Sequence, residues 1–463
     1  MANEPAAFLQ GNLMRHITVM ALTASIGLMA IFVVDLVDMI FISMLGKEEL
    51  AAAVGYAGAI LFFTSSFGIG VAIAAGALVA RALGEGDSHT ASRRAATSLF
   101  YGVIFGAIFA AAVWFNVRPL AMLVGASGET LDMAVLYLQI IIPSLPLLII
   151  GMVGGAILRA HGDARRAMIA TILGGVVNAV LDPILIFGFD LDLVGAAIAS
   201  VAARVTIGAV ALYPIFRWHG GLERPTAAEF RVDFPAIMAI ALPAIMTQFA
   251  TPIGQAYVTR SMAQFGAEAV AGMAIISRLV PVSFGVIFAL SGAIGPVIGQ
   301  NFGAGQYGRV RRAYADGLVF TLIVVLVVTT LLYLLRAPIA DLFSATGQTR
   351  DLIFLFCGPL ALAWVFNGVL FVSNAVFNNL GHPYYSTWIN WGRHTLGTIP
   401  FVILGAGWYQ GAGVLFGQAF GGLVFAVIAV VLVLRVMRSK ETPTKAPAYA
   451  RQTRLIQLSH NRR

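Results

Sequence analysis

The first half of the sequence contains the run Gly174-Gly-Val-Val-Asn178-Ala-Val-Leu-Asp182-Pro183-Ile-Leu-Ile-Phe187, which is apolar except for one amide and one carboxylate. A spacing of four places Asn178 and Asp182 one turn apart on the same helix face. An ionisable side chain at membrane depth costs at least about 2.5 kcal/mol, so such groups usually face a cavity or a partner and mark an ion or substrate path. Pro183 has no N–H to give to the carbonyl of Ala179, which predicts a kink. The run therefore predicts a membrane helix with a functional carboxylate, and a local cap or pair is the simpler alternative for Asp182.

The composition is that of a polytopic membrane protein. Of the 463 residues, 59% are hydrophobic and only 11% are charged, and the mean hydropathy is +0.88, whereas about a quarter of the residues of soluble proteins are charged. The formal net charge of +8 comes from basic residues between apolar runs and in the tail, a pattern typical of membrane topology and not of nucleic-acid binding. The single cysteine, Cys357, excludes a disulfide framework or a cysteine-based metal site within one chain. We expect the lipid bilayer and a small-molecule substrate as partners, no nucleic acid, and a functional monomer.

About twelve apolar runs are long enough to cross a bilayer as helices. They lie near 15–44, 52–80, 96–116, 133–157, 167–188, 193–216, 235–263, 269–299, 314–335, 352–377, 385–406 and 411–436. Basic residues collect in alternate connecting segments, such as those with Arg93, Arg165, Arg224 and Arg311. Because such segments are cytoplasmic, we expect a multi-pass protein of the inner (plasma) membrane with both termini in the cytoplasm.

The two halves of the sequence repeat each other. After the second run, Gly84-Glu-Gly86-Asp87 precedes Ser92-Arg93-Arg94-Ala95, and after the eighth run Gly303-Ala-Gly305-Gln306 precedes Val310-Arg311-Arg312-Ala313. An even number of spans in each half predicts two six-helix lobes related by a pseudo-two-fold axis along the membrane normal, as in alternating-access carriers. We expect an N-terminal lobe at 1–216, a cytoplasmic linker at 217–234, a C-terminal lobe at 235–438 and a disordered basic tail at 439–463.

The motifs resemble those of the multidrug and toxic compound extrusion (MATE) family of transporters. The residues that carry the resemblance are Asp38 in the first run, the two Gly-x-Gly segments, Leu158-Arg-Ala-His-Gly162-Asp163 after the fourth run, and Asn178-x-x-x-Asp182-Pro183. The resemblance implies an all-helical secondary antiporter, not an enzyme. Such a protein exports amphiphilic organic compounds or drugs by alternating access in exchange for H⁺ or Na⁺, without a cofactor.

The resemblance also points to the branch of the family whose cation site lies in the first lobe. The positions that match the polar cluster of that branch are Asp38, Tyr137, Asn178, Asp182 and Ser200. Asp38, Asn178 and Asp182 are the candidate ligands if the coupling ion is Na⁺. Ser200 replaces the more frequent threonine and keeps the hydroxyl group.

Asp35 and Asp38 are three residues apart and so share one helix face. With Asp182 they would form a cluster of three carboxylates, which cannot all be ionised in a low dielectric unless a cation lies among them. A hydrogen bond to a neighbouring helix is the alternative for Asp35. Arg204 follows Ser200 by one turn and is expected to neutralise one carboxylate.

The second half differs in charge from the first. Its spans are expected to lack carboxylates, because Gln255 aligns with Asp35 and the tenth span carries Asn374 instead of an acid. Arg278 and Arg393 lie inside apolar runs, and both arginines, with Gln255 and Asn374, are candidates for a substrate cavity. The alternative for a single buried arginine is a purely structural role.

Two other functions stay open from the sequence. A flippase for a lipid-linked precursor would use cavity arginines to bind a pyrophosphate, and an intramembrane aspartyl hydrolase would use Asp38 and Asp182. No P-loop, His-Glu-x-x-His motif or usable nucleophile elbow occurs. The sequence leaves the substrate, its charge and the choice between H⁺ and Na⁺ undetermined.

Overall fold

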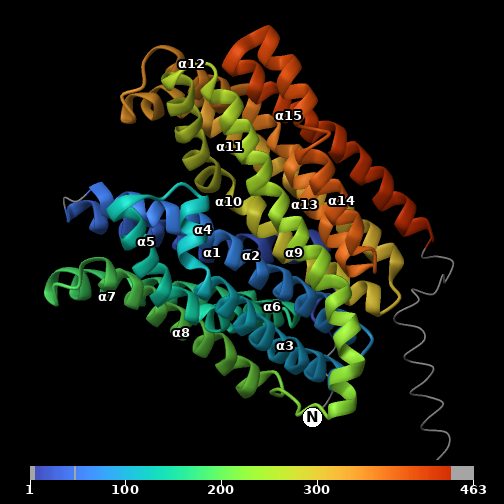
Figure 1. Cartoon of the computed structure of the whole chain (residues 1–463). Helices are drawn as coiled ribbons and strands as arrows, with labels where there is room; N and C mark the ends of the chain where they lie inside the picture. Colours follow the sequence, from blue (N-terminus) through green and yellow to red (C-terminus); the bar gives the residue numbers. More distant parts are fainter. Residues whose placement is uncertain (1–5, 46–47, 440–463) are drawn as a thin grey trace, which may run out of the picture. The chain divides into compact units, whose positions relative to one another are not determined.

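The computed structural model describes residues 6–45 and 48–439, and within these residues all regular secondary structure is helical. The expected tail at 439–463 lies outside the described residues apart from Ser439. The helices are labelled in Figure 1. Their bounds in the first half are α1 (Leu13–Met44), α2 (Glu48–Gly84), α3 (Ser88–Phe115), α4 (Val117–Leu123), α5 (Gly128–Ile141), η1 (Ile142–Ser144), α6 (Leu145–Ala160), α7 (Ala164–Pro183), η2 (Ile184–Gly188) and α8 (Asp192–Trp218). In the second half they are α9 (Ala227–Ala263), α10 (Ala267–Gly303), α11 (Tyr307–Leu342), α12 (Gly347–Leu355), η3 (Phe356–Leu360), α13 (Trp364–Asn379), α14 (Pro383–His394) and α15 (Ile399–Ser439).

The chain forms two compact units. Unit 1 contains Ile26–Ile245, and unit 2 contains Phe8–Ser25 together with the chain from Met246 onward. Both α1 and α9 are therefore shared: the N-terminal part of each helix belongs to one unit and the remainder to the other. The lobe boundaries expected from the sequence remain a prediction.

Each unit has its own apolar core. In unit 1 the fully buried side chains include Leu138, Ile149 and Ile157, from α5 and α6. In unit 2, Phe284 of α10 and Phe356 of η3 are members of the core, and the ring of Phe284 stacks on Trp364 with the ring centroids 4.7 Å apart. These cores hold the membrane helices together by close packing, because lipid offers no hydrophobic driving force between helices.

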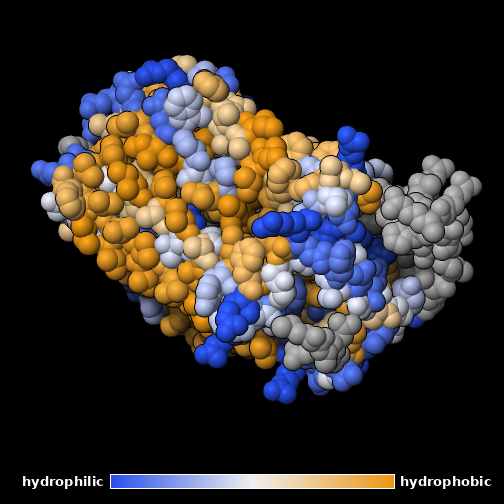
Figure 2. Space-filling model, turned by 90° about the horizontal axis from the view of Figure 1, so that it is seen from below, coloured by the Kyte–Doolittle hydropathy of each residue, from blue (hydrophilic) through white to orange (hydrophobic). Residues whose placement is uncertain are grey.

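The membrane-spanning helices confirm the expected all-α polytopic fold. Ten helices among the described residues are long and apolar enough to cross a membrane, and an eleventh span is the bent pair Gly347–Leu360 and Trp364–Asn379. The last of the ten covers Pro383–Ser439, 57 residues, in which two runs were expected. Figure 2 shows apolar side chains exposed over wide areas of the face in view, as a lipid-facing surface requires.

The C-terminal helix α15 is a hairpin of two helices. Its backbone leaves the helical conformation at Tyr409 and Gln410, and on either side of this break the two arms approach backbone to backbone. A Cβ atom on Gly413 would lie 1.8 Å from the carbonyl oxygen of Gly405, and one on Gly421 would lie 1.5 Å from that of Gly397. Small residues four apart allow this approach, so α15 contains the end of one expected span and the whole of the next.

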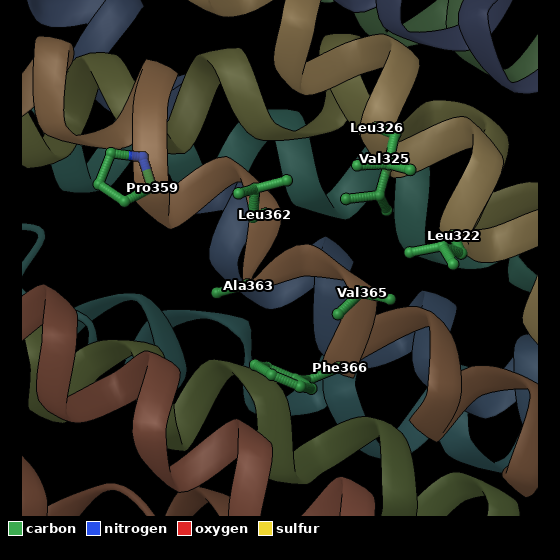
Figure 3. Close-up of a pocket in the computed structure, with 8 residues that line it drawn as sticks. All are labelled: Leu322, Val325, Leu326, Pro359, Leu362, Ala363, Val365 and Phe366. Atoms are coloured by element: carbon green, nitrogen blue, oxygen red, sulfur yellow. The ribbon is translucent and has the colours of Figure 1, made fainter.

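The helix of the expected tenth span is broken in unit 2. Its two parts are bent by 55° around Gly358 and Pro359, where a π-turn interrupts the α-helix. Beside the break lies a cavity of about 320 Å³, shown in Figure 3, between α11 and the broken helix. All of its lining residues are apolar: Leu322, Val325, Leu326, Pro359, Leu362, Ala363, Val365 and Phe366.

Candidate functional site

The polar centre of unit 1 is formed where α7 ends. Asp182 is the residue before Pro183, and the five residues after Pro183 form a π-helix instead of continuing the α-helix. The change from α-helix to π-helix follows from the missing N–H of proline. Gly195 of α8 contacts the backbone of η2 so closely that a Cβ atom would lie 2.8 Å from the carbonyl carbon of Leu185. The kinked end of α7 is thus held in place on α8.

Asn178 connects two carboxylates. Its Nδ2 donates a hydrogen bond to Oδ2 of Asp182 at 2.9 Å and a longer one to Oδ1 of Asp38 at 3.4 Å. The Asp38 and Asp182 carboxyl groups are also within hydrogen-bonding reach of each other. Asp182 is fully buried and Asn178 nearly so, and Oδ1 of Asp182 is a buried oxygen with no hydrogen-bond donor among the described residues. We call Asp38, Asn178 and Asp182 the carboxyl pair and its bridging amide.

Two hydroxyl groups complete this site. The side chain of Tyr137 on α5 lies near that of Ser200 on α8, and it is close enough to Asp38 and Asp182 to interact with their charges. The structure therefore brings together five of the residues that were predicted from the resemblance, from four helices that are distant in sequence.

Asp35 does not join this group. Its side chain is exposed, although it is near enough to Asp38 for a charge interaction. No group of three His, Cys, Asp or Glu side chains arranged to hold a metal ion occurs within residues 6–45 and 48–439. The expected cluster of three carboxylates is thus reduced to a pair, because a shared helix face does not place both Asp35 and Asp38 at the depth of Asp182.

The expectation for Arg204 was wrong. Its Nη1 donates to Oγ of Ser144 at 2.9 Å and to the carbonyl oxygen of Ile141 at 3.2 Å, and it forms no ion pair with Asp38 or Asp182 among the described residues. The physical reason is the 3₁₀ turn Ile142–Ser144, which interrupts the α-helical hydrogen-bond pattern and leaves carbonyl groups at the end of α5, such as that of Ile141, for side-chain donors. Arg204 satisfies one of them and fastens α8 to α5.

The four candidates for a substrate cavity lie in unit 2 on four different helices. Gln255 of α9 accepts a hydrogen bond from Nε2 of Gln418 at 3.4 Å, and Asn374 of α13 accepts one from Nδ2 of Asn390 at 3.2 Å. Arg278 of α10 is exposed and Arg393 of α14 is half-buried. Within residues 6–45 and 48–439 no hydrogen bond or ion pair joins any two of the four, and none of them lines the apolar cavity of Figure 3.

The residue next to Arg393 is a buried histidine. His394 is 5% exposed, and neither ring nitrogen has a hydrogen-bond partner within the described residues. The ring lies on α9, where a Cβ atom on Gly254 would be only 2.1 Å from Nδ1. The neighbouring Gln255 thus belongs to the same contact region of α9 and α14.

The expectation that the spans of the second half lack carboxylates was also wrong. Asp316 is a buried residue inside α11, and Nε of Arg312 pairs with its Oδ1 at 2.9 Å. The spacing of four on one helix face would have revealed this pair. Because the charge of Asp316 is compensated by its own helix, it adds no free negative charge to unit 2.

The described residues form ten or more helices that are able to span a membrane, with a carboxyl pair among them of which Asp182 is fully buried, an arrangement typical of polytopic membrane proteins of the transporter class. The model of the MatE family matches the chain twice, at residues 23–184 and 243–404, which also confirms the internal repeat. The chain belongs to this family, the MATE transporters.

Two of its relatives are named as transport proteins. The FAD transporter of Shewanella oneidensis is 31% identical over 397 residues, which cover 84% of this chain and 87% of that protein. The multidrug export protein MepA of Staphylococcus haemolyticus is 25% identical over 432 residues, 92% of this chain and 94% of the relative. Among solved structures, a MATE transporter of Vibrio cholerae shares the fold with a TM-score of 0.87 at 24% identity, over 92% of this chain and 97% of that one.

Proposed function

We propose that this protein is a secondary antiporter that exports an amphiphilic organic compound across the inner membrane in exchange for protons. The carboxyl pair and its bridging amide carry this proposal. Two carboxylates that close in a buried site cannot both be ionised, so the pair takes up and releases one proton in preference to standing fully charged. A site whose proton occupancy differs between two conformations is what a proton-driven antiporter requires.

The direction of the Asn178 amide supports a proton over Na⁺. Its nitrogen faces both carboxylates, and an N–H donor repels a metal ion. Carboxylate and amide oxygens would suit a hard cation, but Asn178 would first have to turn its oxygen toward the pair. Na⁺ exchange is therefore the competing outcome of the experiment below.

One exchanged proton provides enough free energy for the task. At an assumed driving force of roughly 150 mV, one elementary charge supplies about 3.5 kcal/mol, which corresponds to a substrate gradient of several hundredfold, about tenfold for each 1.4 kcal/mol. A single carboxyl pair is therefore sufficient for coupling.

The substrate is proposed to be an organic anion or zwitterion with an apolar ring system. Unit 2 carries Arg278 and Arg393 without a carboxylate ion pair among the described residues, and Asp316 is already neutralised by Arg312. One relative is named as a transporter of FAD, which is an anion. The MepA relatives are named as multidrug export proteins, and their similarity supports a wider range of substrates. Arginine binds phosphate and carboxylate groups through paired hydrogen bonds.

The deciding measurement is substrate-dependent ion flux in proteoliposomes. Purified protein is reconstituted, and an imposed proton gradient or an imposed Na⁺ gradient is tested for its ability to drive accumulation of FAD and of a cationic dye. We expect FAD accumulation driven by the proton gradient alone. Accumulation driven only by Na⁺ would replace the proton in this proposal, and the absence of any gradient-driven transport would refute antiport.

A further inference from the structure

The N-terminal segment of the chain is bound by the turn between α10 and α11 in unit 2. The backbone N–H of Phe8 donates to Oε1 of Gln300 at 2.8 Å, and the Phe8 carbonyl oxygen accepts from Nδ2 of Asn301 at 3.1 Å. Arg309 donates to the same carbonyl through Nη2 at 2.9 Å, to the carbonyl of Gly11 through Nη1 at 3.2 Å, and to Oδ1 of Asn301 through Nε at 2.8 Å. Gln300 and Asn301 are fully buried. We call these contacts of Arg309 the α1 anchor.

The helix that follows is packed as firmly as the anchor itself. Leu13, Ile17, Met20 and Ala21 are buried at helical spacing along the part of α1 that belongs to unit 2. The remainder of α1 belongs to unit 1 and carries Asp38. One continuous helix thus begins in the anchor of unit 2 and reaches the carboxyl pair of unit 1.

Unit 1 holds the beginning of α9 in the same way. Arg93 of α3 binds Asp233 through Nε at 3.2 Å and Nη2 at 3.3 Å, and Oγ1 of Thr97 donates to Oδ2 of Asp233 at 3.1 Å. The hydroxyl of Tyr101 donates to the carbonyl oxygen of Phe230 at 2.8 Å. Asp233 is 2% exposed, so its charge depends on these partners. We call the contacts of Arg93 the α9 anchor.

The two anchors occupy corresponding places in the repeats but use different residues. Each lies at the segment with the Gly-x-Gly motif, where Arg93 aligns with Arg311, yet the α1 anchor is made by Arg309. Arg93 donates hydrogen bonds to a carboxylate, whereas Arg309 donates them to backbone carbonyl groups. Different residues thus make an anchor at the corresponding place of each repeat. This indicates a shared requirement: the beginning of the first helix of each repeat is fixed in the unit that is built mainly from the other repeat.

From this arrangement we propose that Arg309 and Arg93 are positioning residues for coupling. By fixing the beginnings of α1 and α9, they transmit a change at the carboxyl pair to unit 2 and a change in unit 2 back to unit 1. A helix whose beginning is fixed in a unit moves together with that unit. A helix whose first turn is free frays, and movement of the unit is then no longer transmitted along it. The inference rests on the proposed antiport, because coupling is the property that the anchors provide.

The first experiment separates coupling from transport as such. Arg309→Gln and Arg93→Gln are reconstituted, and gradient-driven accumulation is compared with downhill substrate exchange in the absence of an ion gradient. We expect accumulation to fall by about 5- to 150-fold, the usual range of an allosteric coupling factor, with downhill exchange within about twofold and Arg118→Gln unchanged as a control. Arg118 also pairs with a carboxylate, Asp132, but at an exposed position away from both anchors.

Rescue tests whether the charge pair itself is responsible. The double variant Arg93→Asp with Asp233→Arg restores the pair in reverse and should regain coupled accumulation that each single variant loses. Equal loss of downhill exchange and accumulation in the glutamine variants would show a merely structural role and overturn the proposal. Unchanged accumulation in both would overturn it as well.

A second measurement does not depend on antiport. In a Cys357→Ser background, Gln10→Cys and Gly308→Cys are joined by a short bis-maleimide, which makes the α1 anchor permanent. Both positions are exposed, and each is the neighbour in sequence of a residue in the contact between Gly11 and Arg309. Downhill exchange should persist after cross-linking within about twofold, because the anchor stays closed throughout the cycle. Loss of exchange on cross-linking, with exchange intact in the untreated double variant, would show that the anchor opens and would refute the proposal, whereas failure of proton coupling alone would refute only the proposed function.

Discussion

Asn178 donates one amide group to both Asp182 and Asp38, at 2.9 and 3.4 Å, and so joins the first helix of the chain to the kinked end of α7. Asn178 and Asp182 share a helix face, whereas Asp38 is reached only through the fold. The amide satisfies one oxygen of each carboxylate and leaves Oδ1 of Asp182 buried without a donor among the described residues. A buried oxygen without a donor would gain a hydrogen bond from the proton that we propose this site exchanges.

The first prediction concerns the carboxyl pair. Asp38→Asn and Asp182→Asn should fold and insert but reduce gradient-driven efflux to the level of empty liposomes, because an amide keeps the shape of the carboxyl group and carries no exchangeable charge. Flux in proteoliposomes and the amount of protein in the membrane are measured together. Full gradient-driven transport by both variants would contradict a role of this pair in coupling.

Neighbouring residues should have graded effects. Ser200→Ala removes a neutral partner, a contribution of about 0.5–1.5 kcal/mol, or about two- to tenfold in affinity, whereas Asn178→Ala removes a donor to carboxylates, a contribution of about 1.5–3 kcal/mol. The affinity of the site for protons is measured as the proton concentration that gives half of the maximal substrate release. This affinity should therefore weaken without being lost. Abolished transport in Ser200→Ala would mean that Ser200 does more than support Tyr137.

The sequence predicted Asn178 and Asp182 because an amide and a carboxylate one turn apart before a proline have a chemical reason to act together in a membrane helix, whereas Asp38 was predicted from the family resemblance. It did not predict the partners of Arg204, the anchor at Arg309, or the exposure of Asp35. The partners of Arg204 and Arg309 depend on which backbone carbonyl groups a turn elsewhere in the chain leaves without a donor. The exposure of Asp35 depends on the rotation of α1 about its axis. Neither can be read from the neighbouring sequence. The twelve spans were predictable because hydrocarbon thickness sets their length, but the bend at Gly358 was not.

The second prediction concerns pH and stability at the turn between α6 and α7. Burial lowers the pKa of His161 from 6.5 to about 4, and the nearby charged and titratable groups are His219 and Asp163. Below pH 6.5 the unfolded chain takes up a proton that the folded protein does not, so stability falls as the pH drops from 6.5 toward 4. His161→Gln should lose less thermal stability over this window in detergent than the unmodified protein.

The control for this effect is His89→Gln, at a histidine whose side chain is 64% exposed. Asp163 does not interfere, since burial is outweighed by its hydrogen bonds from His219 and Arg166, which lower its pKa to about 2. Its stabilising contribution is lost only as the pH falls below the ordinary value of 3.8 toward 2. Identical melting curves for His161→Gln and the unmodified protein across the upper window would contradict the prediction.

The third prediction concerns the hairpin of α15. A Cβ atom on Gly421 would lie 1.5 Å from the carbonyl oxygen of Gly397, whereas one on Gly422 would meet only Phe366 at 4.0 Å. Gly421→Ala must push the two arms apart and should destabilise the protein by about 1–3 kcal/mol, measured as the midpoint of unfolding in detergent. Gly422→Ala, one residue away, should leave the midpoint nearly unchanged, and equal effects of the two substitutions would contradict this packing.

The fourth prediction concerns orientation in the membrane. Because basic residues gather near both Gly-x-Gly segments, these should face the cytoplasm. In a Cys357→Ser background, single cysteines at Asp87→Cys and Gln306→Cys should both resist a membrane-impermeant thiol reagent in intact cells and react once the membrane is opened. Labelling of only one of them in intact cells would be incompatible with two repeats of the same orientation.

The last prediction concerns the charge of the substrate. Arg278 and Arg393 have no carboxylate ion pair among the described residues, so a cation near them would be repelled in a low-dielectric space, where one charge pair matters by kilocalories. If both arginines face the substrate, Arg278→Gln and Arg393→Gln should weaken transport of FAD about tenfold or more, the loss expected when a charged hydrogen bond of about 1.5–3 kcal/mol is removed. Transport of a cationic dye should be unchanged or improved. Arg118→Gln, at an exposed and paired arginine, should change neither. An equal loss for both probes would mean that the arginines only stabilise unit 2, and exclusive transport of cations by the unmodified protein would refute the preference, because the unpaired positive charge of Arg278 and Arg393 would then have no effect on what is carried.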